Sequence, residues 1–341
     1  MSAPKRVVYI DPLWAIGDDG RIAPETAAVE HAVYGDRVSI TFGILDGGTY
    51  VREGPRAEAL VRGTDALVIS RAQITPALVD AMGATCKVVG RAGVGFDNLN
   101  IPLLRTQGIY GFNVPDYCVD EVSTHALALI LALERRIGLL DAHIKSGNWS
   151  TYDGTPPRRM STLTLGVVGF GNIGRATARK AQAFFKNVIA YDPYVHSDLM
   201  EGYGVRKCDQ LTGLTATSDV IAVHALLSDE TRKLIDANAL RGVRPGTILV
   251  NTARGDIVDP QAVLDALDDG RLGGYGSDVF TPENPLEHGI NATIIGRPNV
   301  LVTPHSAFRS VEAEISQRRR VAQGVLHVLE TGEPPPFGRQ A

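Results

Sequence analysis

The sequence predicts an α/β protein with two domains, each built around a parallel sheet. Short apolar segments alternate with helical stretches along the chain, and parallel strands need such helical crossovers. The chain has 341 residues, which is too long for one ordinary core and fits two domains. Hydrophobic residues make up 44% and charged residues 21%, as in ordinary globular proteins, so a largely disordered chain is excluded.

The first α/β run occupies the N-terminal third of the chain. Strands are expected at Val7–Ile10, Ala66–Ile69 and Lys87–Gly90. Thr75 followed by Pro76 predicts the start of a helix between the last two strands, because Thr caps helices and Pro is favoured at the first helical position.

A second α/β run begins at Leu163, after a long helical pattern at Val119–Ser146. The apolar stripe of that helix is wide, which predicts burial and a surface for a homodimer. A last helix is expected from Ser310 to about Glu330. The strands of the second run are expected at Thr164–Gly169, Asn187–Tyr191, Val220–His224, Thr247–Asn251 and Gly274–Val279.

Charge and cysteine usage exclude several classes of protein. The net charge is -4, and the short run Arg318–Arg320 fits the solvated face of a helix, so no nucleic-acid surface is indicated. The three cysteines are far apart and form no CxxC pair, which argues against disulfides and thiolate zinc sites, and Cys118 is expected to be buried. The histidines have no metal-ligand spacing either, so no metal is expected.

The N-terminus leads directly into the apolar segment Val7–Ile10. That segment is too short for a signal peptide or a membrane span. Together with the unpaired cysteines, it predicts a cytoplasmic protein.

The strongest local motif is a GxGxxG sequence with an apolar strand before it and a helical stretch after it. Gly169 permits the tight turn, Gly171 lets the backbone approach a pyrophosphate, and Gly174 allows close packing of helix on strand. The helix N-terminus adds free N–H groups and a partial positive charge. The predicted cofactor-binding residues of this motif are Gly169, Gly171, Asn172, Ile173 and Gly174.

Asp192 ends the next strand, at the place where an acid accepts hydrogen bonds from the adenosine ribose. A carboxylate there repels a 2′-phosphate, and the following Pro193 and Tyr194 add no cation. NAD is therefore predicted in preference to NADP.

Four further segments complete a pattern: VVGRAGVGFDN at 88–98, NTARGDIVD at 251–259, SDVFTPENP at 277–285 and TPHSAF at 303–308. With GFGNIG and YDP, they resemble the D-isomer-specific 2-hydroxyacid dehydrogenase family, which includes phosphoglycerate dehydrogenases. The sequence NVPDYCVDEV and the HSAF ending look nearest to the branch related to the C-terminal binding protein corepressors. The resemblance covers nearly the whole chain and implies an NAD-binding Rossmann domain plus a flavodoxin-like substrate domain.

From the resemblance, residues 1–111 and 304–341 are expected to form the substrate-binding domain, and residues 112–303 the NAD-binding domain. The two crossings between domains, near Gly111 and Thr303, are expected to act as hinges.

The resemblance also implies a catalytic set of Arg254, Glu283 and His305. Imidazole titrates near neutral pH, so His305 is the expected general acid and base. Glu283 is expected to fix the tautomer of that ring, and the planar fork of Arg254 to hold a substrate carboxylate. Each residue alone has an ordinary structural interpretation, such as a surface ion pair of Arg254 with Asp256.

Further contacts are expected on the same basis. His224 is interpreted as structural, although its neighbours border the cofactor. Arg71 is a weaker substrate candidate than Arg91, and the two together would suit a substrate with a second acidic group. The other expected cofactor contacts are Ala225, Leu226, Thr252, Ala253 and Asp278, and the expected substrate contacts are Arg91, Gly93, Val94, Gly95 and Phe308.

The sequence thus predicts an NAD-dependent oxidoreductase that interconverts a small 2-keto acid and the D-2-hydroxy acid, acting as a cytoplasmic homodimer. One alternative is an NAD-gated binding protein like the corepressors, in which turnover is incidental. Another is a formate or phosphite dehydrogenase, although the Glu–His pair favours a substrate with a hydroxyl proton to remove.

Overall fold

The computed structural model describes residues 3–150 and 155–338, and the chain divides into two compact units. Unit 1 consists of Met1–Tyr117 and Ser310–Ala341, and unit 2 of Cys118–Arg309. The predicted crossings near Gly111 and Thr303 are therefore too early. Within the described ranges, no helix is both long and apolar enough to cross a membrane.

Local structure explains both shifts. The strand Tyr110–Asn113 pairs in parallel with Val88–Arg91, so it belongs to the sheet of unit 1. After Thr303, the backbone N–H groups of Ser306 and Ala307 donate hydrogen bonds of 2.9 Å to the carboxylate of Asp278, which keeps this turn in unit 2.

Unit 1 is built on a five-stranded parallel sheet of order β2-β1-β5-β6-β7. Apart from the short antiparallel pair β3–β4, this is the strand order of a flavodoxin-like fold, as predicted. The strands are β1 (Lys5–Tyr9), β2 (Val38–Phe42), β3 (Leu45–Asp46), β4 (Thr49–Tyr50), β5 (Ala66–Ile69), β6 (Val88–Arg91) and β7 (Tyr110–Asn113). The helices are α1 (Ala28–Tyr34), α2 (Gly54–Val61), α3 (Pro76–Met82), α4 (Ile101–Thr106) and α12 (Val311–Thr331).

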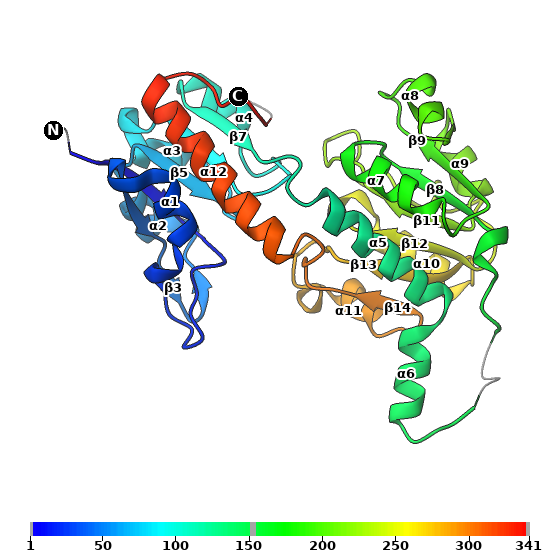
Figure 1. The fold of residues 1–341 in the computed structure, drawn as a ribbon. Helices are drawn as coiled ribbons and strands as arrows, with labels where there is room; N and C mark the ends of the chain where they lie inside the picture. The colour runs from blue at the N-terminus through cyan, green and yellow to red at the C-terminus, as the bar shows by residue number, and fades with distance from the viewer. Residues whose placement is uncertain (1–2, 151–154, 339–341) are drawn as a thin grey trace. The chain divides into compact units, whose positions relative to one another are not determined.

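Both faces of this sheet are covered, because successive strand residues point to opposite sides. Val8 and Leu67 pack with residues of α2, α3 and α4 in one core cluster. Val7 and Val68 pack with α1 and α12 in the other, so the C-terminal helix completes the N-terminal unit, as Figure 1 shows in red against blue. The predicted cap of α3 is confirmed, since Thr75 Oγ1 accepts a hydrogen bond from the Leu78 N–H at 3.3 Å.

The predicted solvated face of Arg318–Arg320 is wrong for its first residue. Arg318 is 8% exposed and donates hydrogen bonds of 2.9 and 2.7 Å to the buried carboxylate of Glu30. Its guanidinium also lies 3.9 Å from the ring centroid of Trp14. Removing one partner of a buried ion pair leaves an uncompensated charge and destabilises the fold. The pair of Arg318 and Glu30 therefore joins α12 to α1.

Unit 2 has a seven-stranded parallel sheet of order β10-β9-β8-β11-β12-β13-β14. Its first six strands follow the 3-2-1-4-5-6 order of a Rossmann fold, which confirms the predicted fold class. The strands are β8 (Thr164–Val168), β9 (Asn187–Tyr191), β10 (Arg206–Lys207), β11 (Val220–Val223), β12 (Thr247–Asn251), β13 (Leu272–Ser277) and β14 (Val300–Val302). The helices are α5 (Val119–Glu134), α6 (Ile137–Lys145), α7 (Asn172–Ala181), α8 (Ser197–Gly202), α9 (Leu211–Thr217), α10 (Pro260–Asp268) and α11 (Gly289–Ile295).

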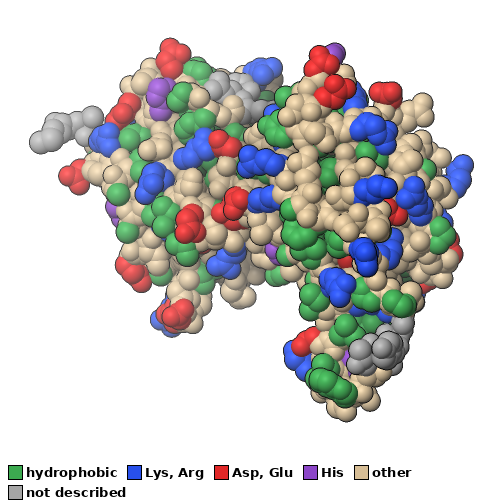
Figure 2. All heavy atoms as spheres, turned by 45° about the vertical axis from the view of Figure 1, so that its right-hand side comes forward, with side chains coloured by type: hydrophobic (Ala, Val, Ile, Leu, Met, Phe, Trp, Pro, Cys, Tyr) green, Lys and Arg blue, Asp and Glu red, His purple; other side chains and the backbone are tan. Residues whose placement is uncertain are grey.

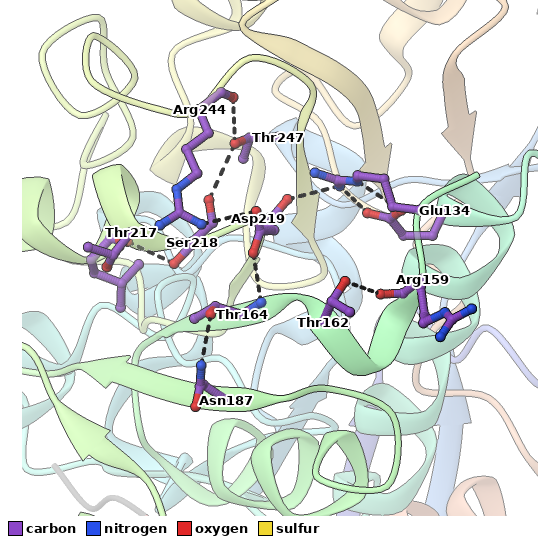
Figure 3. A network of polar contacts seen from close by, with 12 residues as sticks. Glu134, Arg159, Thr162, Thr164, Asn187, Thr217, Ser218, Asp219, Arg244 and Thr247 are labelled. Carbon is purple, nitrogen blue, oxygen red and sulfur yellow. Dashed lines mark hydrogen bonds and ion pairs between the residues drawn. The ribbon is translucent and has the colours of Figure 1, made fainter. Parts of the chain in front are cut away.

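Two core clusters again lie on opposite faces of the sheet. Residues of α5, α7 and α8 pack on one face, and residues of α9, α10 and α11 on the other. At the amino end of the sheet, Asp219 accepts hydrogen bonds from the Thr164 N–H at 2.8 Å and from Arg244 at 3.2 Å (Figure 3). Arg158 joins the same network by pairing with the buried Glu134 and with the Asp219 carbonyl, so the chain after α6 is attached to the sheet.

The predicted single helix Val119–Ser146 is in fact two helices. Arg136 takes a left-handed backbone conformation with φ +57°, which ends α5 and redirects the chain into α6. The apolar pattern continues through both helices, so periodicity does not reveal the break. Seven residues of α5 are buried, whereas α6 buries none. α6 projects from unit 2, and hydrophobic side chains lie at its surface (Figures 1 and 2).

Candidate functional site

The glycine motif forms the turn between β8 and α7. Gly169 has φ +90°, and a Cβ there would lie 2.5 Å from the Ala225 nitrogen. A Cβ on Gly174 would lie 2.1 Å from the Gly169 carbonyl oxygen, so α7 packs directly on the turn. A Cβ on Gly171 would meet no described atom within 4 Å, so this backbone faces open space at the helix start. These three environments fit a bound pyrophosphate with its charge at the N-terminus of α7.

Asp192 lies at the end of β9, beside this turn. Its Oδ2 accepts a hydrogen bond of 2.8 Å from the Phe170 N–H, and its Oδ1 one of 3.0 Å from the Tyr194 N–H. Each carboxylate oxygen keeps lone pairs for further donors. The arrangement therefore fits hydroxyl donors of a ribose, which is the predicted contact.

The other expected cofactor residues follow the neighbouring strands β11 and β12. Leu226 is 39% exposed, whereas Thr252 is buried, with its Oγ1 3.4 Å from Nδ1 of His224. The Ala253 N–H donates a 3.0 Å hydrogen bond to the side chain of Asn251. Ligands of open parallel sheets bind outside the carboxyl ends of the strands, which is where these residues lie.

His224 has its own electrostatic character. Burial lowers the pKa of its imidazole to about 4, so the ring is neutral at physiological pH. Among the described residues its Nε2 has no hydrogen-bond partner. This environment agrees with a structural histidine rather than a proton carrier.

The structure brings Glu283 and His305 together. Nδ1 of His305 lies 2.9 and 3.0 Å from the two carboxylate oxygens of Glu283. Because a carboxylate only accepts hydrogen bonds, Nδ1 carries a proton and Nε2 is left to exchange one with a substrate. The side chain of His305 is 21% exposed, so the ring is reachable from solvent.

Arg254 follows β12, in the loop next to the one that carries Glu283. A Cβ on Gly255 would lie 2.3 Å from the backbone of Phe280, so the two loops are in direct contact. Asn251 holds the arginine backbone by donating a 2.8 Å hydrogen bond to its carbonyl. Asp256 pairs with Arg232 at 2.9 Å.

Asp278 follows β13 and organises the turn that bears His305. The His305 N–H donates to the Asp278 carbonyl at 2.8 Å. His305 itself has φ +52°, a left-handed conformation that is uncommon for a residue with a side chain. Phe308 follows in the same turn, and its ring is edge-on to the imidazole, with the two ring centroids 6.4 Å apart. Phe308 is thus a neighbour of the predicted general acid.

In unit 1, the predicted anion loop follows β6. A Cβ on Gly93 would lie 1.2 Å from Nη1 of Arg91, so the guanidinium occupies the space that only glycine leaves. The Val94 carbonyl accepts a 2.5 Å hydrogen bond from Asn113, which fixes the loop ahead of Gly95. Arg71 is exposed, on a separate loop after β5. Cys118 is 2% exposed, as expected.

Sequence reasoning missed several residues that build these sites. Thr303 and His125 lie beside Asp278, and Asp11 holds the loop of Arg71. Arg175, at the start of α7, donates to the Gly171 carbonyl and so adds a cation at the glycine turn. Each of these is a common residue without a motif of its own. Arg175 reaches the glycine turn from within α7, whereas His125, Thr303 and Asp11 reach their sites only through contacts between segments far apart in the chain.

Residues 127–307 match the model of the NAD binding domain of the D-isomer specific 2-hydroxyacid dehydrogenases. The chain is 35% identical over 320 residues to D-3-phosphoglycerate dehydrogenase of Mycobacterium tuberculosis, covering 93% of this chain and 57% of the relative. It is 33% identical over 257 residues to hydroxypyruvate reductase of Thermotoga maritima, covering 75% of this chain and 81% of the relative. The chain spans little more than half the length of the phosphoglycerate dehydrogenases that it matches.

A crystal structure of D-lactate dehydrogenase from Aquifex aeolicus, complexed with NAD and lactic acid, superposes with a TM-score of 0.82. The two chains are 26% identical, and the match covers 96% of each. Fold and site thus define a dinucleotide-binding protein with a two-domain α/β architecture. The chain belongs to the D-isomer specific 2-hydroxyacid dehydrogenase family, and its unit 2 contains the NAD-binding domain of that family.

Proposed function

We propose that the chain is an NAD-dependent oxidoreductase that interconverts a small 2-keto acid and the corresponding D-2-hydroxy acid. The observation that carries this proposal is the contact of His305 Nδ1 with Glu283, which leaves Nε2 for proton transfer. The resemblance to D-lactate dehydrogenase and hydroxypyruvate reductase supports the class of reaction. The same pair disfavours formate or phosphite as the donor, because neither presents a hydroxyl group bonded to carbon.

In the reduction, NADH supplies the hydride to the carbonyl carbon of the keto acid. His305 donates the Nε2 proton to the carbonyl oxygen, which becomes the hydroxyl group, and regains a proton from solvent. Glu283 keeps the ring in the orientation and tautomer that this transfer needs. In the oxidation the same nitrogen accepts the hydroxyl proton.

Arg254 holds the substrate carboxylate and polarises the keto group through its planar donor fork. We assign Phe308 to the substrate site because its ring lies next to the imidazole of His305. In unit 1, Arg91 and the backbone of Gly93–Gly95 are proposed to bind the substrate carboxylate or a second acidic group. An Arg91→Ala variant with unchanged KM for every keto acid would remove Arg91 from the site.

We propose that NAD is preferred to NADP. The glycine turn and Asp192 hold the dinucleotide, and the carboxylate of Asp192 disfavours a 2′-phosphate. The fold of the family does not decide this preference. A glyoxylate/hydroxypyruvate reductase of Sinorhizobium meliloti has a similar structure and 25% sequence identity, and it is NADPH-dependent. Competing rates with NADH and NADPH test it directly.

A homodimer is proposed through α6 rather than α5. Unit 2 buries one face of α5 in its own core, whereas Ile137 and Ile144 of α6 are 56% and 55% exposed. Trp149, just beyond α6, is 85% exposed. Apolar side chains gathered on a projecting helix suit a second copy of the same surface. Sedimentation should find a dimer, and the double variant Ile137→Asp, Ile144→Asp should be a monomer.

The test of the proposed reaction is NADH oxidation, followed by the loss of absorbance. The panel holds glyoxylate, hydroxypyruvate, pyruvate, phenylpyruvate, 2-oxoglutarate and phosphohydroxypyruvate, with NADPH in parallel. Turnover with NADH should fall by about a hundredfold or more in His305→Asn. No turnover on any keto acid, with NADH binding intact, would instead support an NAD-gated binding protein.

A further inference from the structure

The turn that carries His305 depends on polar groups outside the catalytic set. Its left-handed φ of +52° is unfavourable for a residue with a side chain, so surrounding contacts must hold it. The carboxylate of Asp278 supplies two of these contacts, since Oδ1 accepts from the Ser306 N–H and Oδ2 from the Ala307 N–H, both at 2.9 Å. Asp278 is only 2% exposed, so these bonds are shielded from water.

A third donor reaches the same carboxylate from the start of the turn. Thr303 Oγ1 donates to Asp278 Oδ1 at 2.5 Å. A threonine hydroxyl has one proton, and Asp278 uses it because an ionised carboxylate cannot donate. Thr303 must therefore accept its other hydrogen bond.

That other bond comes from helix α5. Nε2 of His125 lies 2.9 Å from Thr303 Oγ1 and 3.9 Å from Asp278 Oδ1. Since the hydroxyl accepts here, Nε2 of His125 must carry a proton. The hydrogen bonds therefore run in one direction, from His125 through Thr303 to Asp278, and we call this series of bonds the relay. The relay joins α5 to the ends of β13 and β14.

We propose that His125 and Thr303 are positioning residues for His305. This proposal rests on the proposed function. The relay keeps the Asp278 carboxylate oriented toward the Ser306 and Ala307 N–H groups, and this orientation fixes where the imidazole of His305 points. Neither His125 nor Thr303 transfers a proton to the substrate. Their loss changes the rate of the proton-transfer step more than the affinity for either ligand, because the misplaced group acts in the transition state.

The first test compares Thr303→Val with Thr303→Ser. Valine keeps the shape but removes the hydroxyl, whereas serine keeps the hydroxyl, so the pair separates the hydrogen bond from packing. We expect kcat to fall about tenfold to a hundredfold in Thr303→Val and to stay within about threefold in Thr303→Ser. The dissociation constant of NADH, measured by its fluorescence, should change less than about threefold in both. A wild-type kcat in Thr303→Val would overturn the proposal.

The second test examines the donor on α5. Leucine in place of His125 removes the N–H group, whereas glutamine offers an N–H near the former position of Nε2. His125→Leu should lower kcat as Thr303→Val does, and His125→Gln should restore most of it. The double variant His125→Leu, Thr303→Val should be no slower than Thr303→Val alone, because both act on one relay. Fully additive losses would contradict a shared pathway.

A readout that needs no turnover separates this proposal from the reaction itself. Histidine ring resonances in 15N-labelled protein, assigned with His125→Gln and His305→Asn, should show a proton on Nε2 of His125. The His305 ring signals should shift in Thr303→Val and not in Thr303→Ser. A neutral His125 with its proton on Nδ1, or unchanged His305 signals in Thr303→Val, would refute the relay. A wild type without turnover but with these NMR results would refute the proposed reaction and leave the relay standing.

Discussion

Both units hold a loop with the buried carboxylate of an aspartate that follows the neighbouring strand. In unit 1, Asp11 follows β1 and accepts hydrogen bonds of 2.7 to 2.8 Å from the N–H groups of Ser70–Ala72, which follow β5. In unit 2, Asp278 follows β13 and accepts from Ser306 and Ala307, which follow β14. The loops carry Arg71, a weaker candidate for substrate binding, and His305, the proposed proton donor, so a parallel sheet in each unit positions a candidate site residue in the same way.

The two carboxylates differ in the groups that compensate their negative charge. Asp11 faces Arg52, whose Nε lies 2.9 Å away. Asp278 faces the hydroxyl of Thr303 and, beyond it, His125. A guanidinium is permanently charged, so Asp11 is neutralised and serves stability. The partners of Asp278 carry no permanent charge, and among the described residues three donors reach its four acceptor positions, beside the proposed catalytic pair.

The largest expected effect is on Asp11. Asp11→Ala leaves three backbone N–H groups and Arg52 without their acceptor in a buried site, which should lower the free energy of unfolding by about 3–5 kcal/mol. Urea denaturation measures this value. Asp46→Ala is the matched control, because Asp46 pairs with Arg56 at the surface with its side chain 66% exposed, and it should change stability by less than about 1 kcal/mol. Equal effects of the two substitutions would contradict the role given to Asp11.

The second effect is a pH dependence that arises in unit 2. Burial lowers the pKa of His224 to about 4 from the 6.5 of an exposed imidazole. The unfolded chain therefore takes up this proton first as the pH falls. The contribution of His224 to the free energy of unfolding is therefore complete above about pH 6.5. It falls by about 3 kcal/mol between about pH 6.5 and 4.

His224→Gln should flatten that acid limb in urea titrations between pH 4 and 7. The exposed His196, with its side chain 79% accessible, provides the control His196→Gln, which should leave the limb unchanged. In unit 1 the corresponding group titrates at alkaline pH, because burial raises the pKa of Tyr9. Its contribution to the free energy of unfolding is lost only as the pH rises above about 10. An acid limb that persists unaltered in His224→Gln would assign it to another group.

The smallest effect sharpens the comparison of the two carboxylates. Asn in place of Asp removes the charge and keeps one acceptor oxygen. Asp278→Asn should cost about 1–3 kcal/mol, the cost of lost hydrogen bonds, because no permanent cation is left unpaired. Asp11→Asn should cost more, since Arg52 then loses its counter-ion. If Asp278→Asn proved the more destabilising of the two in urea denaturation, the assigned difference between the loops would be wrong.

Much of the fold is predictable from the sequence, because buried parallel strands are continuous apolar runs. Ala66–Ile69, Asn187–Tyr191 and Thr247–Asn251 have their predicted bounds. β2 and β7 were not predicted, since Ser39, Thr41 and the glycine and asparagine of β7 interrupt the apolar pattern. The break between α5 and α6 depends on one backbone conformation at Arg136, which periodicity cannot detect.

The site divides in a similar way. Gly169 belongs to a motif with fixed spacing, and Glu283 and His305 are predicted by the family resemblance of the segments that contain them. Thr303 and His125 are far apart in the chain, and they meet only because β14 ends beside β13 while α5 crosses the same edge. Their roles follow from the count of donors and acceptors around Asp278, which requires coordinates.

The configuration of the hydroxy acid product tests the proposed D-2-hydroxyacid dehydrogenase reaction. A keto acid that supports NADH oxidation should be converted by the wild type, and the hydroxy acid separated by chiral chromatography. The product should be the D isomer, and its formation should be about a hundredfold slower or more in His305→Asn while NADH still binds. The L isomer, or undiminished product formation by His305→Asn, would contradict the assignment of His305 as the proton donor of a D-2-hydroxyacid dehydrogenase.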